Sequence, residues 1–213
     1  MKTLFIHRSV GNNLIQDSSF YQLLTNSGLK DEFDDYNNND GVLRNRNGNN
    51  NLGLKFPNDN TKPADYAELF SEQGSKDYKE LYDFVMKYDQ IIIKSCYPNS
   101  NIKSISELDR TKKHYTQIAT HFVQLGKKLI IMTSPPLRPT STTPESASRA
   151  RNLADWLALE NFGSNISVFD FFSLLASDGN VLKKEYRRLI WLDNHPNAKA
   201  SREVAPKLVA KIV

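Results

Sequence analysis

Near its N-terminus the chain reads Thr3-Leu4-Phe5-Ile6-His7-Arg8-Ser9-Val10-Gly11-Asn12-Asn13. The apolar run Thr3–Ile6 predicts a buried strand, and the spacing of apolar residues over Asn12–Asn26 predicts a helix. A strand that leads within a few residues into a helix is the building unit of parallel α/β sheets. We therefore expect Ser9 to lie where the first strand ends and the first helix begins.

The rest of the chain repeats this alternation of short apolar runs and helical patterns. Ser104-x-x-Glu107 resembles a capping box, and Thr143 followed by Pro144 is typical of a helix start. The alternation predicts one α/β domain over residues 1–213, a three-layer α/β/α sandwich around a mostly parallel central sheet of about five strands. After Thr3–Ile6 the expected strands are Glu32–Tyr36, Gln90–Ile93, Leu129–Met132 and Ile166–Phe169, and the last helix begins after Asn197.

Residues 37–60 interrupt this pattern, because they are dense in Asn, Asp and Gly. These residue types favour turns, since they tolerate positive φ angles. A loop of this length inside a compact domain is usually functional or mobile. We expect an irregular Asn-rich loop near the functional site rather than a disordered linker.

The composition excludes several kinds of protein. The chain has 28 Lys and Arg residues against 24 Asp and Glu residues, and the net charge of +4 is spread along the sequence, so we expect no nucleic-acid partner. The single cysteine, Cys96, excludes an intramolecular disulfide and a cysteine-rich metal site. No apolar run approaches the roughly 20 residues of a membrane span, so we expect no membrane partner.

The N-terminal residues also bear on where the protein acts. The first apolar run, Leu4-Phe5-Ile6, is too short for a signal peptide and is followed by His7-Arg8. The absence of a signal peptide predicts a cytoplasmic protein. If a signal peptide has been removed from this sequence, we expect a secreted one. No feature of the sequence indicates an oligomeric state.

The two ends of the chain carry residues that fit nucleophilic catalysis. Ser9 follows the first strand, and ligands of open parallel sheets bind beyond strand ends of this kind. Asp193 and His195 lie in the stretch Leu192-Asp193-Asn194-His195-Pro196-Asn197, before the last helix. A serine nucleophile needs a base, and the base needs an orienting acceptor. Taken separately, Ser9 also fits a helix N-cap, and the second stretch also fits a turn before an asparagine N-cap.

Together these stretches resemble the SGNH or GDSL-type hydrolases. Ser9-Val10-Gly11 is similar to the first sequence block of that family, with His7-Arg8 in place of the usual Gly-Asp. His195-Pro196-Asn197 is similar to the end of the last block. The usual Asp-x-x-His spacing is shortened here to Asp-x-His, which related acetyltransferase domains also use. The resemblance implies a flavodoxin-like fold with Ser9 as nucleophile, His195 as base and Asp193 as the third member of a triad.

The resemblance also implies an oxyanion hole built from three segments. Its donors would be the Ser9 amide, a glycine after the second strand and an asparagine after the third. Gly41 is the best match to the glycine. Asn99 is the first choice for the asparagine and Asn101 the second, because the usual Gly-x-Asn-Asp string is absent.

We therefore expect a serine esterase that hydrolyses acetyl or other short acyl esters through an acyl-Ser9 intermediate, without a cofactor or a metal. The substrate would be a small-molecule or polysaccharide acyl ester, and only the family resemblance implies the carbohydrate part. Two alternatives stay open. One is an O-acyltransferase that uses the same serine, and the other is a catalytically inactive carbohydrate-binding module of the same fold.

Overall fold

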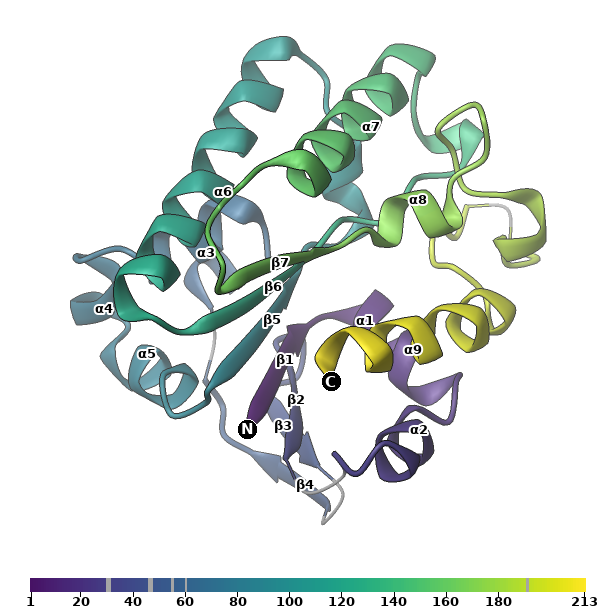
Figure 1. Cartoon of the computed structure of the whole chain (residues 1–213). Coiled ribbons are helices and arrows are strands. Elements are labelled where there is room, and N and C mark those ends of the chain that lie inside the picture. The colour runs from purple at the N-terminus through teal and green to yellow at the C-terminus, as the bar shows by residue number, and fades with distance from the viewer. Residues whose placement is uncertain (30–31, 46–47, 55, 60, 191) are drawn as a thin grey trace.

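A computed structural model describes residues 1–29, 32–45, 48–54, 56–59, 61–190 and 192–213. Over these residues seven strands form one sheet in the order β4-β3-β2-β1-β5-β6-β7 (Figure 1). Neighbouring strands from β2 to β7 in this order run parallel, whereas β3 and β4 are antiparallel additions beside β2. The strands are β1 (Thr3–His7), β2 (Phe33–Asn37), β3 (Val42–Asn45), β4 (Gly48–Asn51), β5 (Gln90–Lys94), β6 (Lys128–Met132) and β7 (Ile166–Phe169).

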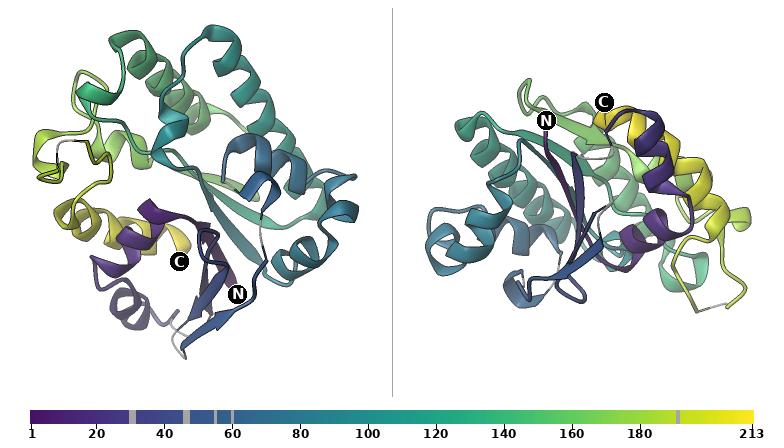
Figure 2. Two further views of the ribbon diagram at one scale, coloured as in Figure 1. Left: turned by 180° about the vertical axis from the view of Figure 1, so that it is seen from behind. Right: turned by 90° about the horizontal axis from the view of Figure 1, so that it is seen from below.

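Helices cover both faces of this sheet (Figures 1 and 2). Side chains of α1, α2, α8 and α9 share one buried cluster with Phe5 and Ile92, and those of α3, α5, α6 and α7 share another with Leu4 and Ile91. Alternate strand residues thus face opposite layers, as the period of a β-strand requires. The helices are α1 (Ser9–Gln16), α2 (Phe20–Asn26), α3 (Pro63–Leu69), α4 (Gly74–Asp77), α5 (Lys79–Val85), α6 (Ile105–Leu125), α7 (Pro144–Leu159), α8 (Phe171–Leu175) and α9 (Ala198–Ile212).

The predicted fold class is confirmed, and several helix caps form as their sequence signals indicate. The Ser104 hydroxyl accepts from the Glu107 N–H at 3.1 Å, and the Thr143 hydroxyl accepts from the Ser146 N–H at 3.2 Å. Both contacts satisfy a backbone donor that has no partner within its own helix. None of the helices in the described part of the chain is long and apolar enough to cross a membrane.

The sheet has seven strands rather than about five, because the Asn-rich stretch 37–60 is not wholly irregular. Strands β3 and β4 lie within it and extend the sheet at β2 as an antiparallel hairpin. β4 is exposed along its whole length, so backbone pairing rather than burial forms it. A strand that buries no face shows no apolar alternation, and the sequence pattern therefore does not reveal it.

The helix predicted over Asn12–Asn26 is two helices, α1 and α2. The break lies at Ser19, whose φ angle of 56° is left-handed. The Ser18 hydroxyl donates back to the Leu14 carbonyl. A Ser side chain competes in this way with the helical backbone, which is consistent with the end of α1 at Gln16. The first helix also starts earlier than predicted, so that Ser9 is its first residue.

The junction between β1 and α1 is tight. Gly11 lies in the first turn of α1 directly over the His7 side chain, and a Cβ atom at residue 11 would lie only 2.3 Å from the Cβ of His7. Only a glycine lets this turn approach the strand so closely. The position of Ser9 therefore depends on Gly11.

We predict that Gly11→Ala destabilises the fold, because the new methyl group overlaps a fully buried side chain. Overpacking of this kind costs about 2–3 kcal/mol, which urea unfolding would measure. Gly179→Ala is the matched control, since a Cβ there would meet its nearest neighbour at 3.9 Å. Equal free energies of unfolding for the two variants would contradict the prediction.

Candidate active site

The candidate site joins the two ends of the chain. Ser9 opens α1 at the carboxyl end of β1, and His195 precedes α9. Helices α1 and α9 lie side by side on the same face of the sheet (Figures 1 and 2). Leu14 of α1 and Val204 and Leu208 of α9 are buried in the same apolar cluster on this face. This packing brings two segments together that lie far apart in the sequence.

Three side chains form a continuous chain of hydrogen bonds across this junction. His195 Nε2 lies 2.8 Å from the Oγ of Ser9, and His195 Nδ1 lies 2.6 Å from Oδ1 of Asp193. Because an ionised carboxylate only accepts, Nδ1 carries the proton and Nε2 is the acceptor. The Ser9 hydroxyl therefore donates to His195. The structure thus brings together the three residues that the sequence proposed as a triad.

The short Asp-x-His spacing has a direct geometric explanation. Oδ1 of Asp193 also accepts from the backbone N–H of His195, at 2.9 Å. An aspartate that binds the backbone two residues further on forms an Asx turn. The same oxygen thereby fixes both the backbone and the ring of His195. Two residues of separation are enough for this arrangement.

Asp193 is held in its charged form. Burial raises the pKa of its carboxyl, but the hydrogen bonds from His195 and the charge of Arg188 outweigh this effect, and the pKa lies below its ordinary value. A carboxyl with a lowered pKa stabilises the folded state above its ordinary pKa, and this contribution is lost as pH falls through the lowered value. At neutral pH Asp193 is therefore an anion facing His195.

Asn197 anchors the segment that carries His195. Its side-chain oxygen caps α9 by accepting from the Ala200 N–H at 3.1 Å. Its side-chain nitrogen donates to the carbonyls of Glu185 and Arg187 at 2.8 and 3.1 Å. One side chain thus ties the start of α9 to the preceding turn, which gives the His-Pro-Asn sequence a structural role.

Arg138 is a second anchor, which the sequence analysis did not identify. It follows β6 and is only 6% exposed. Its guanidinium donates to the carbonyls of Arg188 and Ile190, and its backbone N–H donates to the side chain of Asn194 at 3.0 Å. A planar guanidinium can hold several carbonyls at once. Arg138 therefore holds the segment before His195 against the body of the protein.

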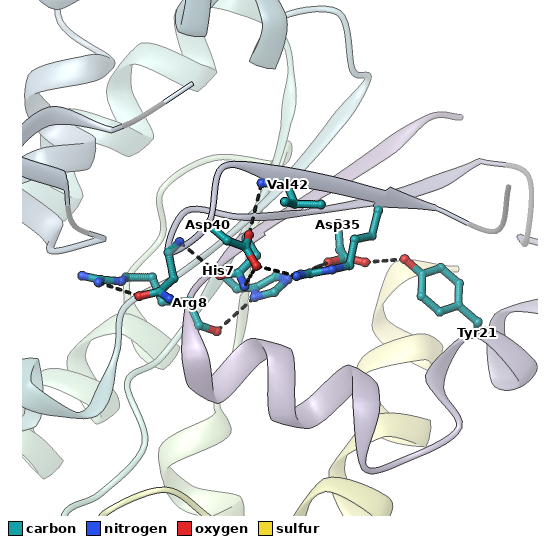
Figure 3. Close-up of polar contacts among 9 residues, drawn as sticks. His7, Arg8, Tyr21, Asp35, Asp40 and Val42 are labelled. Carbon is teal, nitrogen blue, oxygen red and sulfur yellow. Dashed lines mark hydrogen bonds and ion pairs between the residues drawn. The ribbon is translucent and has the colours of Figure 1, made fainter. Parts of the chain in front are cut away.

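His7 fixes the start of α1, which carries the other half of the site (Figure 3). Its Nε2 lies 2.9 Å from Oδ1 of Asp35, and its Nδ1 lies 3.0 Å from the carbonyl oxygen of Arg8. Each ring nitrogen of His7 therefore faces an oxygen that can accept a hydrogen bond. Tyr21 donates to the same carboxylate. Because the Arg8 carbonyl also accepts from the Asn12 N–H of α1, His7 ties the helix start to β2.

Ser9 lines a pocket at the carboxyl end of β1. Asn99, the first choice for the oxyanion asparagine, lines this pocket. Asn101, the second choice, is not among the described residues of its wall. The Asn101 side chain instead contacts Thr142, at 3.4 Å. The described lining residues are Arg8, Ser9, Asn39, Lys62, Cys96, Tyr97, Pro98 and Asn99.

Gly41 does not join this group, contrary to the expectation from sequence. Its N–H donates to the Asn37 carbonyl at 2.9 Å, and its carbonyl accepts from Leu52. These contacts close the turn into β3, so the Gly41 amide is already occupied. The residue at the pocket wall after β2 is Asn39. Asn39 lies two residues beyond the end of β2, and this position in the sequence is the signal that indicates it.

Tyr97 is a further residue of the site that the sequence did not single out. Its ring packs edge-on against the His195 ring, with centroids 5.1 Å apart and planes at 79°. Burial and the charge of Asp193 raise the pKa of the Tyr97 hydroxyl, so it stays neutral near physiological pH. The contact of Tyr97 with the His195 ring therefore limits the rotation of that ring.

Comparisons with known proteins identify the fold. No protein-family profile matches the sequence, and no curated protein matches it either. Among solved structures, a proposed acylhydrolase of Bacteroides fragilis is similar over 99% of this chain and 85% of its own, with 12% identity and a TM-score of 0.61. A proposed lipolytic protein of the G-D-S-L family from Desulfitobacterium hafniense is similar over the whole of both chains, with 13% identity and a TM-score of 0.57. An acetyl xylan esterase likewise aligns over the whole of both chains, with 14% identity and a TM-score of 0.54.

We predict that Arg138→Met loosens the segment before His195. The carbonyls of Arg188 and Ile190 lose their donor, which costs about 1–3 kcal/mol and speeds hydrogen exchange at the amides of Asp193 and His195. Arg149→Met is the control, because Arg149 donates to the carbonyls of Ile102 and Lys103, away from His195. Unchanged exchange at Asp193 and His195 in the Arg138 variant would show that this anchor is not needed.

Proposed function

The chain has the fold of the SGNH and GDSL-type hydrolases, and we propose that it is a serine esterase acting on acetyl or other short acyl esters. The observation that carries the proposal is the hydrogen-bonded series Asp193–His195–Ser9, with 2.6 and 2.8 Å between the successive groups. An ionised acid, an oriented base and an exposed hydroxyl are the components of a serine nucleophile. Ser9 lies at the wall of a pocket that a substrate can enter.

In the proposed reaction, Ser9 Oγ attacks the ester carbonyl carbon while His195 Nε2 takes the hydroxyl proton. The tetrahedral intermediate collapses as His195 gives this proton to the leaving alcohol, which leaves an acyl group on Ser9. Water then attacks the acyl carbon while His195 takes a proton from it. His195 gives this proton to Ser9 Oγ as the C–O bond to the acyl group breaks, which releases the acid and free Ser9. Asp193 stays ionised and stabilises the imidazolium form of His195 in both steps.

Two donors in the pocket fit the oxyanion of the intermediate. The first N–H groups of a helix have no acceptor within the helix, and the positive end of the helix dipole lies there. The Ser9 amide is such a group in α1. Asn99 supplies a side-chain amide in the same pocket; one of its N–H groups donates to the Cys96 carbonyl at 3.2 Å, and the second N–H remains for the oxyanion. We propose the Ser9 amide and the Asn99 side chain as the oxyanion donors, without Gly41.

Acetylated carbohydrates are the first substrates to test. The pocket wall is polar, with the amides of Asn39 and Asn99 and the ring of Tyr97 available to sugar hydroxyls. An acetyl xylan esterase is among the proteins of similar fold. An acyltransferase would use the same residues with a sugar hydroxyl in place of water, and product analysis with a labelled acyl donor separates the two activities. A catalytically inactive binding module has no need for the aligned contacts among Asp193, His195 and Ser9.

We predict that Ser9→Ala lowers kcat/KM for 4-nitrophenyl acetate at least about 1,000-fold without changing the melting temperature, because the nucleophile alone is removed. A fluorophosphonate should label the natural protein and leave the variant unlabelled. Ser27→Ala is the control, since Ser27 is an exposed serine at the end of α2. Full activity in the Ser9 variant would refute the proposed nucleophile.

Asp193→Asn tests the acid of the series. The amide oxygen can still accept from His195, but it has no charge to stabilise the imidazolium, so kcat should fall by about 100- to 10,000-fold. KM should change little, because Asp193 does not line the pocket. Asp17→Asn removes the other carboxylate beside Arg188 and serves as the control. Similar kcat values for the two variants would exclude a role for the Asp193 charge.

A further inference from the structure

The described wall of the pocket in front of Ser9 carries more positive than negative charge. Among its described lining residues, Arg8 and Lys62 are cations, and none of the others is acidic. We propose that the ester bound in this pocket carries a negatively charged group (a carboxylate, phosphate or sulfate) that Arg8 and Lys62 recognise. This inference rests on the proposed esterase function and names the substrate class of the same site.

Arg8 is placed to meet such a group close to the reacting bond. It is the N-cap residue of α1 and directly precedes Ser9. Its Nη2 donates to the side-chain oxygen of Asn39 at 3.0 Å, and Asn39 is itself a wall residue. In Figure 3 the Arg8 side chain extends away from Asp35, the carboxylate that faces His7. A guanidinium presents a planar set of donors that matches the oxygens of carboxylate and phosphate groups.

Lys62 contributes the second charge from a fixed piece of backbone. It precedes Pro63 at the start of α3, and its backbone N–H donates to Oδ2 of Asp65 at 3.0 Å. Its side chain is exposed and forms no ion pair within the described ranges. The carboxylate of Asp65 accepts instead from this backbone N–H and from Asn58.

Two other arginines, Arg44 and Arg188, are paired with carboxylates. Arg44 contacts the carboxylates of Asp40 and Asp35, and Arg188 lies 3.7 Å from both Asp17 and Asp193. Lys62 differs from them because no carboxylate of the described chain balances it. A pocket wall whose described residues are cationic and not acidic attracts an anionic substrate, whereas a neutral substrate feels no comparable electrostatic attraction.

Two matched pairs of esters test the inference and locate the charge. The pair 4-nitrophenyl hydrogen glutarate and 4-nitrophenyl pentanoate places a carboxylate or a methyl group on the acyl side. The pair 3-acetoxybenzoate and methyl 3-acetoxybenzoate compares a carboxylate with its neutral methyl ester on the alcohol side of the acetyl ester. We expect kcat/KM to favour the anionic member of at least one pair by about tenfold or more at low salt, and this preference to shrink as salt is added.

Lys62→Glu should abolish or reverse this preference, because it replaces an attractive charge by a repulsive one. Lys87→Glu makes the same change in net charge near the start of β5, at the end of the strands opposite the pocket. This variant should keep the preference for the anionic ester. Both residues are exposed, so neither change requires repacking of the core.

The failure of this inference and the failure of the esterase proposal give different results. Equal kcat/KM within both pairs, or equal effects of the Lys62 and Lys87 variants, would overturn the anionic substrate while Ser9-dependent hydrolysis of 4-nitrophenyl acetate continued. If none of the esters were hydrolysed and no fluorophosphonate labelled Ser9, the esterase proposal would fail and the anionic substrate with it.

Discussion

Helices α1 and α9 pack against each other on one face of the sheet, and this contact holds the two halves of the candidate site in register. The hydrogen bond between Ser9 and His195 lies at the surface, where a single hydrogen bond contributes only about 1 kcal/mol. The side chains buried between the helices, among them Leu14, Val204 and Leu208, each contribute about 1.5–3 kcal/mol. The apolar contact therefore brings Ser9 and His195 together, and the polar contact orients them.

Two histidines show how neighbouring atoms set the role of the same side chain. His7 is fully buried, and both of its nitrogens face oxygen acceptors, so it serves as a fixed link between the start of α1 and β2. His195 faces one carboxylate and one hydroxyl, which leaves one nitrogen free to accept a proton. Only the second arrangement suits a base. The first supplies rigidity directly beneath Ser9.

The strand arrangement and the residues of the hydrogen-bonded series could be predicted from the sequence because each rests on a contiguous signal. The buried strands are short apolar runs, and β7 has the bounds that its run predicts. The capped helices begin at Ser, Thr or Asn residues that satisfy their own first turns. Ser9 and the Asp193–His195 pair lie within short motifs at strand or helix ends. Local chemistry is enough to find such features.

The tertiary structure alone decided the features that depend on which groups are already paired. The sequence determined that a glycine, Gly41, follows β2, but only the fold engages its amide in a turn and leaves Asn39 at the pocket wall. The hairpin β3–β4 forms because β3 pairs with the free edge of strand β2. The hydrogen bonds of Arg138 to the segment before His195 join residues about 50 positions apart. Sequence patterns report which side faces the core, whereas hydrogen bonds between distant segments depend on how the layers pack. For that reason the residue types of the site were readable in the chain, and the walls of its pocket were not.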